Sequence, residues 1–115
     1  MQQFKHIKRF IELGVHDVPQ VGGKNSSLGE MYRELSAKNI MVPNGFATTA
    51  DAYRYYIDSN GLHDKIAAAL DALDTTDVDA LAATGHQIRE WVRNATMPKD
   101  LGDEIVAAYV ELSGD

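Results

Sequence analysis

The residues with the clearest chemical potential are two adjacent glycines and a lysine, Gly22, Gly23 and Lys24, which stand directly before a predicted helix. Glycines let backbone amides approach an anion closely, and the free amides at a helix N-terminus attract negative charge. A lysine adds a compact, mobile cation. This combination suits a polyphosphate ligand. The same residues are also compatible with a simple glycine turn followed by a solvated lysine.

Neither of the two common phosphate-binding fingerprints is present around these residues. In the pattern G-x-x-x-x-G-K-[ST], the first glycine would have to stand at Val18 and the final hydroxyl residue at Asn25. The pattern G-x-G-x-x-G is absent because Gly22 and Gly23 are adjacent and no glycine follows two residues after Gly22. The local residues alone therefore leave the phosphate site as one of two interpretations.

Other side chains with possible chemistry have simpler interpretations. The 4 histidines form neither an H-E-x-x-H motif nor an i,i+4 pair, and the acidic residues lack the spacing of a calcium-binding loop. Thr48 and Thr49 fit a nucleotide cleft or a helix cap equally well. Tyr53, Tyr55 and Tyr56 could stack on an adenine, but aromatic residues at helical spacing indicate a core. We predict no catalytic residue and no metal ligand within this chain.

The elements that must position the glycine–lysine loop are short strands and one helix. Apolar residues before Gly14 predict a strand or two, and the glycines and proline over 15–23 predict a loop. Ser27 and Glu30 have the spacing of a capping box, which predicts a helix from Ser27 to about Lys38. Its expected inner face consists of Leu28, Met31 and Leu35.

The rest of the chain is predicted to be mainly helical. Residues 39–50 predict a short strand interrupted by a turn at 43–45. Thr48 and Asp51 repeat the capping pattern for a helix that ends in a left-handed residue at Gly61. Apolar residues at helical spacing then predict helices over 62–73, 81–92 and 101–112, with Thr76 as the cap of the second of these.

Length and composition limit the class of protein. The 115 residues, 44% hydrophobic and 24% charged, correspond to one globular domain or a piece of one. The absence of cysteine excludes thiolate chemistry and predicts a reducing cytoplasm. A net charge of -6 disfavours nucleic acid, and no apolar stretch is long enough for a membrane span. The chain stops at a turn just after a predicted helix, so we expect it to be part of a longer protein.

Two runs in the first half resemble the pyruvate phosphate dikinase family. They are VGGKNSSLGEM at 21–31 and VPNGFATTADAY at 42–53. In that family a V-G-G-K-N-x-S-L-G-E-M run precedes V-P-x-G-F-A-T-T-A-x-A-Y at this distance. The resemblance implies an α/β fold, helix-rich with a few short strands, in which 1–115 is the N-terminal part of the ATP-binding domain, the first subdomain of an ATP-grasp region. It also implies that Lys24 contacts the ATP phosphates and that Gly22 and Gly23 belong to the same loop.

The resemblance further implies an activity for the parent protein. In the phosphoenolpyruvate-forming branch, ATP, pyruvate and water give phosphoenolpyruvate, AMP and phosphate through a phosphohistidine on another domain. The expected cofactors are ATP and Mg²⁺, with magnesium ligands outside this chain. The expected parent is a cytoplasmic homo-oligomer without nucleic-acid or membrane partners, and this piece alone is expected to be inactive. The alternatives are an antibiotic-phosphorylating relative and a non-enzymatic helical interaction module.

Overall fold

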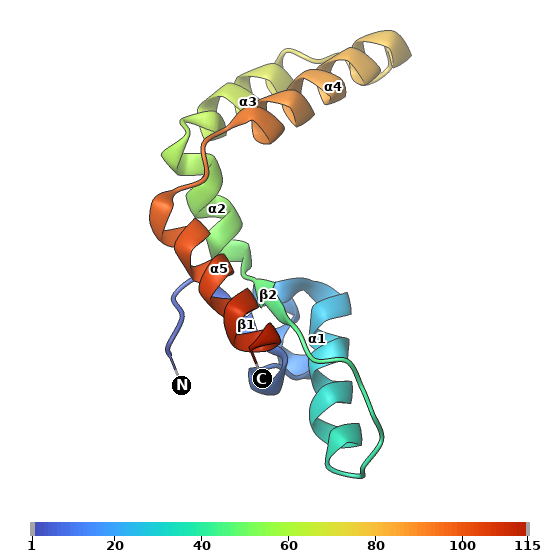
Figure 1. Ribbon diagram of the computed structural model, residues 1–115. Coiled ribbons are helices and arrows are strands. Elements are labelled where there is room, and N and C mark those ends of the chain that lie inside the picture. Colours follow the sequence, from blue (N-terminus) through green and yellow to red (C-terminus); the bar gives the residue numbers. More distant parts are fainter. Residues whose placement is uncertain (1, 115) are drawn as a thin grey trace. The chain divides into compact units, whose positions relative to one another are not determined.

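The fold is helix-rich with one small sheet, as the computed structural model of residues 2–114 shows (Figure 1). This confirms the predicted α/β class. The elements in chain order are β1 (Ile7–Arg9), two 3-10 turns (Phe10–Glu12 and Val15–Asp17), α1 (Val18–Ser36), β2 (Phe46–Thr48), α2 (Ala50–Ser59), α3 (Leu62–Asp71), α4 (Val78–Asn94) and α5 (Lys99–Ser113).

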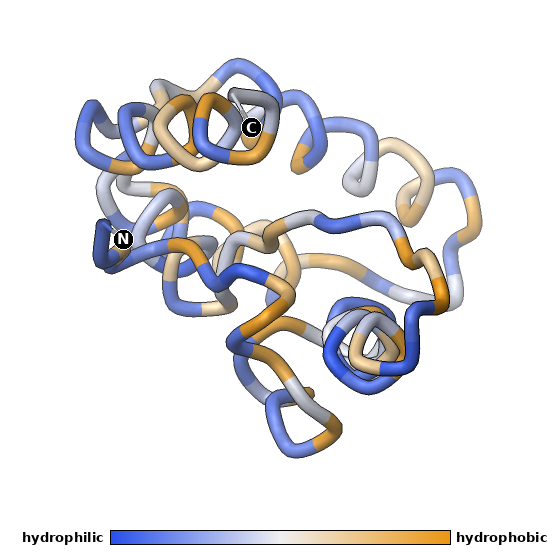
Figure 2. The backbone as a smooth tube through the Cα atoms, turned by 60° about the horizontal axis from the view of Figure 1, so that its bottom comes forward, coloured by the Kyte–Doolittle hydropathy of each residue, from blue (hydrophilic) through white to orange (hydrophobic). Residues whose placement is uncertain are grey.

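The chain divides into two compact units. The first unit comprises the residues up to Tyr53 together with those from Lys99 onward, and the second unit is Arg54–Pro98. The glycine–lysine loop, the sheet and α5 all belong to the first unit. Along the helices, hydrophobic and hydrophilic residues alternate (Figure 2), as expected when one side of each helix is covered.

In the first unit, β1 and β2 pair antiparallel, with Ile7 opposite Thr48 and Arg9 opposite Phe46. Helix α1 packs on the two 3-10 turns that follow β1, and α5 lies against β1. The hydrophobic core forms where α1 meets these turns and β2. It consists of Phe10, Leu13, Val21 and Ala47, with the half-buried Leu28 and Tyr32 packed against it.

In the second unit, polar side chains join the end of α2 to the end of α4. The hydroxyl of Tyr56 donates to the carbonyl of Val92 at 2.7 Å. The side chain of Asn60 donates to the carbonyl of Tyr56 at 2.8 Å and to that of Thr96 at 2.9 Å. The stop expected at Gly61 is confirmed, because this glycine has φ 65°.

The predicted boundaries around α1 are wrong. Residues 15–23 form a 3-10 turn and the start of α1 rather than a loop, and Pro19 lies in the first turn of the helix, where its missing amide hydrogen costs nothing. Ser27 is an exposed residue inside α1 and not its cap. Residues 40–42 form no strand, so the strand predicted there is confined to Phe46–Thr48.

Two helix caps lie one residue later than predicted. The side chain of Thr49, not Thr48, accepts a hydrogen bond from the amide of Ala52 at 3.0 Å. Asp77 rather than Thr76 caps α4, since its carboxylate accepts from the amide of Ala80 at 3.1 Å. In both cases two neighbouring residues have side chains able to cap. Thr48 is the last residue of β2 and pairs with Ile7 of β1. The hydroxyl of Thr76 donates to Asp74 instead of capping the helix.

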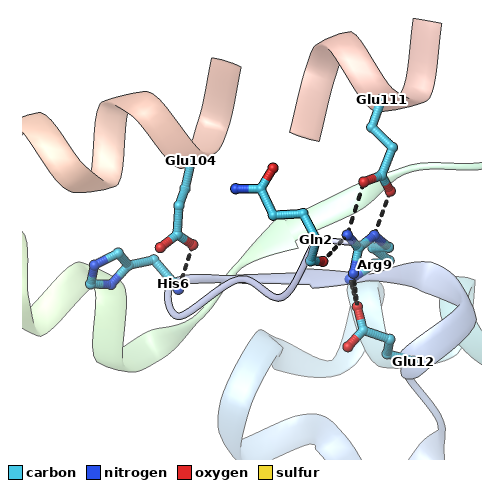
Figure 3. Close-up of polar contacts among 6 residues, drawn as sticks. All are labelled: Gln2, His6, Arg9, Glu12, Glu104 and Glu111. Atoms are coloured by element: carbon cyan, nitrogen blue, oxygen red, sulfur yellow. Dashed lines mark hydrogen bonds and ion pairs between the residues drawn. The ribbon is translucent and has the colours of Figure 1, made fainter. Parts of the chain in front are cut away.

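The side chain of Arg9 joins β1 to α5 (Figure 3). Its Nε and Nη2 donate to the two carboxylate oxygens of Glu111 at 2.5 and 2.9 Å, and its Nη1 donates to Glu12 at 3.2 Å. The guanidinium also donates to the carbonyl of Gln2 and lies 4.4 Å from the centre of the Phe4 ring. A two-pronged bond of this kind fixes orientation as well as distance, so Arg9 holds α5 on the strand.

The bond to Arg9 makes the stability of the first unit depend on pH. Hydrogen bonding from Arg9 lowers the pKa of Glu111 below its usual value. A carboxyl group with a lowered pKa in the folded state stabilises the fold above its unfolded pKa of about 4.3, and this contribution disappears as pH falls through the folded pKa. We expect Glu111→Gln to lower Tm by a few degrees at pH 7, with the difference shrinking below about pH 4. Thermal unfolding across this range measures it, and an equal difference at all pH values contradicts it.

Candidate phosphate-binding loop

The residues Gly22, Gly23 and Lys24 lie at a break inside α1. Gly22 has φ 83° and ψ 166°, whereas the residues on either side of it are helical. A positive φ of this size is readily adopted only by glycine. The break separates a first helical turn from a longer second segment, which begins at Gly23. The glycines and Lys24, which were predicted to precede a helix beginning at Ser27, therefore lie inside α1, at the start of its second segment.

The surface at this break is open. Beyond its chain neighbours and the backbone of its own helix, a methyl group added to Gly22 or Gly23 would meet no atom within 4 Å. Lys24 is exposed, and among residues 2–114 no hydrogen bond or ion pair involves its ammonium group. The backbone of the two glycines and the lysine side chain are thus accessible to a ligand from solvent. A helix start with glycines and a free cation is an arrangement that can take an anion such as a phosphate chain.

Two side chains directly after Lys24 fix the loop. The Asn25 side chain donates to the carbonyl of Val21 at 3.0 Å. Ser26 is 1% exposed, and its hydroxyl donates to the carbonyl of Gly14. Sequence reasoning did not single out either residue. The only feature of the sequence that could have indicated them is that two short polar residues follow one another. In the structure, both side chains bond to other parts of the first unit.

One turn further along α1, Gly29 makes the closest approach of the helix to the preceding segment. A methyl group on Gly29 would lie 2.4 Å from the Cβ of Leu13 and 3.0 Å from the carbonyl oxygen of Phe10. The predicted inner face is therefore only partly right. Leu28 packs on the core, but Met31 is 41% exposed, and the fully covered positions of α1 after the break are Ser26 and Gly29.

Of the two roles considered for the threonine pair, the structure shows the helix cap, at Thr49. This residue caps α2 and also lines a cavity of 250 Å³ in the first unit. Two lysines and the first turn of α1 form other parts of the wall. The lining residues are Lys5, Lys8, Pro19, Gln20, Thr49, Ala50 and Asp51. This cavity adjoins the turn before the break, whereas Gly22, Gly23 and Lys24 are not part of its wall.

The tyrosines of α2 differ from the prediction of a common core. Tyr53 is 58% exposed and Tyr55 is 37% exposed, so that prediction is wrong for both. Tyr56 is half-buried and bonded to α4. Tyr55 and Tyr56 are consecutive and therefore point to different sides of the helix. Tyr53 lies one turn before Tyr56 and is exposed even so.

Two further observations concern other kinds of site. Among residues 2–114, no group of three histidine, aspartate or glutamate side chains is placed to hold a metal ion. None of the helices in that part of the chain combines the length and the apolar character that a membrane span requires.

Comparison with known proteins identifies the family. Residues 18–115 match the model of the pyruvate phosphate dikinase AMP/ATP-binding domain. The chain belongs to this family. The match begins at the first residue of α1 and includes the whole candidate loop.

The chain is also similar to several enzymes named phosphoenolpyruvate synthase. It is 57% identical over 102 residues to the one from Pseudomonas aeruginosa (strain UCBPP-PA14), which is 89% of this chain and 13% of that protein. It is 48% identical over 106 residues to that of Neisseria meningitidis serogroup B, covering 92% and 13%. For the Escherichia coli (strain K12) protein the identity is 47% over 104 residues, covering 90% and 13%. The chain thus spans about 13% of the length of these relatives.

Proposed function

We propose that this chain is the N-terminal part of the ATP-binding domain of a phosphoenolpyruvate synthase. We further propose that the loop of Gly22, Gly23 and Lys24 binds the phosphates of ATP. The observation that carries the proposal is the 57% identity with a phosphoenolpyruvate synthase over 89% of the chain. The open helix start with its unpaired lysine supports the site, because its chemistry matches a polyphosphate ligand.

In this proposal Lys24 acts through its charge. Phosphoryl transfer depends mainly on positioning the phosphates and on neutralising the charge that develops on them. The exposed ammonium group of Lys24 supplies a positive charge, and the amides after Gly22 supply hydrogen-bond donors. Neither group has to move a proton. When Mg²⁺ is bound to ATP it neutralises further phosphate charge, and we place its protein ligands outside this chain.

The remaining steps belong to the parent protein. We propose that a histidine of another domain accepts the β- and γ-phosphoryl groups of ATP with release of AMP, loses the γ-phosphoryl group to water as phosphate, and passes the β-phosphoryl group to pyruvate. The net reaction consumes ATP, pyruvate and water and yields phosphoenolpyruvate, AMP and phosphate. The chain described here contributes the nucleotide site and is inactive alone. The parent is proposed to be a cytoplasmic homo-oligomer.

The products formed by the full-length protein test this function. Incubation with ATP, Mg²⁺ and pyruvate, followed by phosphorus NMR, is expected to show phosphoenolpyruvate, AMP and phosphate in equal amounts. When pyruvate is omitted, no phosphoenolpyruvate forms, and AMP and phosphate stop at about one equivalent per protein. Formation of ADP without phosphoenolpyruvate contradicts the proposal. Transfer of phosphate to an antibiotic in place of pyruvate would assign the protein to the other branch considered above.

A further inference from the structure

The side chain of Asn25 forms a hydrogen bond that spans the candidate loop. Its Nδ2 donates to the carbonyl oxygen of Val21 at 3.0 Å. Donor and acceptor therefore flank Gly22, Gly23 and Lys24, which are the three residues of the proposed phosphate site. Asn25 is half-buried, so water competes less for this bond than it would at a fully exposed position.

Apart from the backbone of α1 itself, few contacts restrain the segment Gly22–Lys24. Glycine has more backbone freedom than any other residue, and two glycines in succession can place the following residue in many ways. Side chains that could pack around Gly22 and Gly23 are absent within 4 Å of the positions their Cβ atoms would occupy. Among residues 2–114, the ammonium group of Lys24 has no hydrogen-bond or ion-pair partner that would hold it in one place.

The neighbouring residue, Ser26, has a different structural role. Ser26 is buried and bonds to Gly14, which anchors the second segment of α1 to the loop after β1. Asn25 then anchors the glycine–lysine loop across the break to the carbonyl of Val21. An amide is suited to this position because it donates a hydrogen bond without placing a charge beside the proposed phosphates.

We infer that Asn25 is a positioning residue, which holds the Gly22–Lys24 loop in the conformation that directs Lys24 to the ATP phosphates. The inference rests on the proposed function. It assigns to Asn25 an effect on nucleotide binding that passes through Lys24, and not a general effect on folding.

A double-mutant cycle in the full-length protein tests this inference. The four proteins are wild type, Asn25→Ala, Lys24→Ala and the double variant, and the measurement is the Kd of a non-hydrolysable ATP analogue with Mg²⁺ by calorimetry. Asn25→Ala is expected to raise Kd about 3- to 10-fold, the usual effect of losing one positioning hydrogen bond. In the Lys24→Ala background the same change is expected to raise Kd by less than about 2-fold, because the group that Asn25 positions is already missing.

Asn60 provides the matched control. Its side chain also donates to the carbonyl four residues before it, that of Tyr56, but it lies in the second unit. Asn60→Ala is expected to leave Kd unchanged. If Asn25→Ala does not fold, as judged by its thermal unfolding, Asn25→Leu replaces it, since leucine keeps the volume and removes the donor.

Each contrary result has a distinct meaning. Unchanged affinity in Asn25→Ala, with weakened affinity in Lys24→Ala, overturns the role of Asn25 and leaves the proposed function intact. An equal loss from Asn25→Ala in both backgrounds overturns the inference as well, because the effect then does not pass through Lys24. Unchanged affinity in Lys24→Ala overturns the proposed function and this inference together.

Discussion

Replacement of Lys24 by alanine in the full-length protein is expected to slow phosphoryl transfer from ATP by at least about 100-fold, the usual cost of removing one group that stabilises developing charge. The fold should be unaffected, because Lys24 is exposed and its ammonium group has no partner among residues 2–114. Incorporation of phosphorus radiolabel from ATP into the protein measures the rate. Thermal unfolding measures the fold.

Lys38 provides a control for net charge. It is an exposed lysine beyond the end of α1, so Lys38→Ala removes the same charge away from the loop. Its labelling rate is expected to match that of the wild type. Near-normal labelling of Lys24→Ala, or an equal loss in both variants, would contradict a specific role for Lys24.

Replacement of Gly29 by alanine is expected to destabilise the first unit by about 3 kcal/mol, at the upper end for overpacking a core. The added methyl group would lie 2.4 Å from the Cβ of Leu13 and 3.0 to 3.1 Å from the carbonyl oxygens of Phe10 and Leu13. Those atoms belong to the core and the backbone, so relief requires α1 to move away from the segment it packs on. A lower urea midpoint for the 115-residue chain, followed by circular dichroism, measures the effect.

Gly85 in α4 provides the matched control for this prediction. It is also a glycine inside a helix, but a methyl group there would meet only the Nη1 of Arg89 at 3.3 Å, the mobile end of a side chain. Gly85→Ala should therefore stabilise the chain by about 0.5 to 1 kcal/mol, through the better helix propensity of alanine. Similar midpoints for the two variants would contradict the close approach at Gly29.

Sequence patterns predicted features that depend on neighbouring residues. The adjacent glycines and Lys24 indicated a nearby helix start, and in the structure α1 is broken at Gly22, with its second segment starting at Gly23. The helix stop at Gly61 could be predicted in the same way, since a residue with left-handed backbone angles ends a helix whatever direction the chain takes next. The helix-rich composition of the second half followed from apolar residues at helical spacing.

The features that sequence patterns missed depend on contacts between distant residues. Gly29 has no side chain and gives no signal in a hydrophobic pattern, yet it determines how closely α1 approaches Leu13. Ser26 is polar but fully covered, because its hydroxyl has a partner in Gly14. The choice of Thr49 over Thr48 as a cap depended on the pairing of Thr48 with β1.

The position of the Lys24 ammonium group relative to bound nucleotide is the most direct test of the proposed site. The measurement is a crystal structure of the full-length protein with Mg²⁺ and a non-hydrolysable ATP analogue. We expect the Nζ of Lys24 to lie about 2.7 to 3.2 Å from a phosphate oxygen, the range of a charged hydrogen bond. A nucleotide bound with its phosphates elsewhere, and Lys24 directed into solvent, would show that this loop is not the phosphate site.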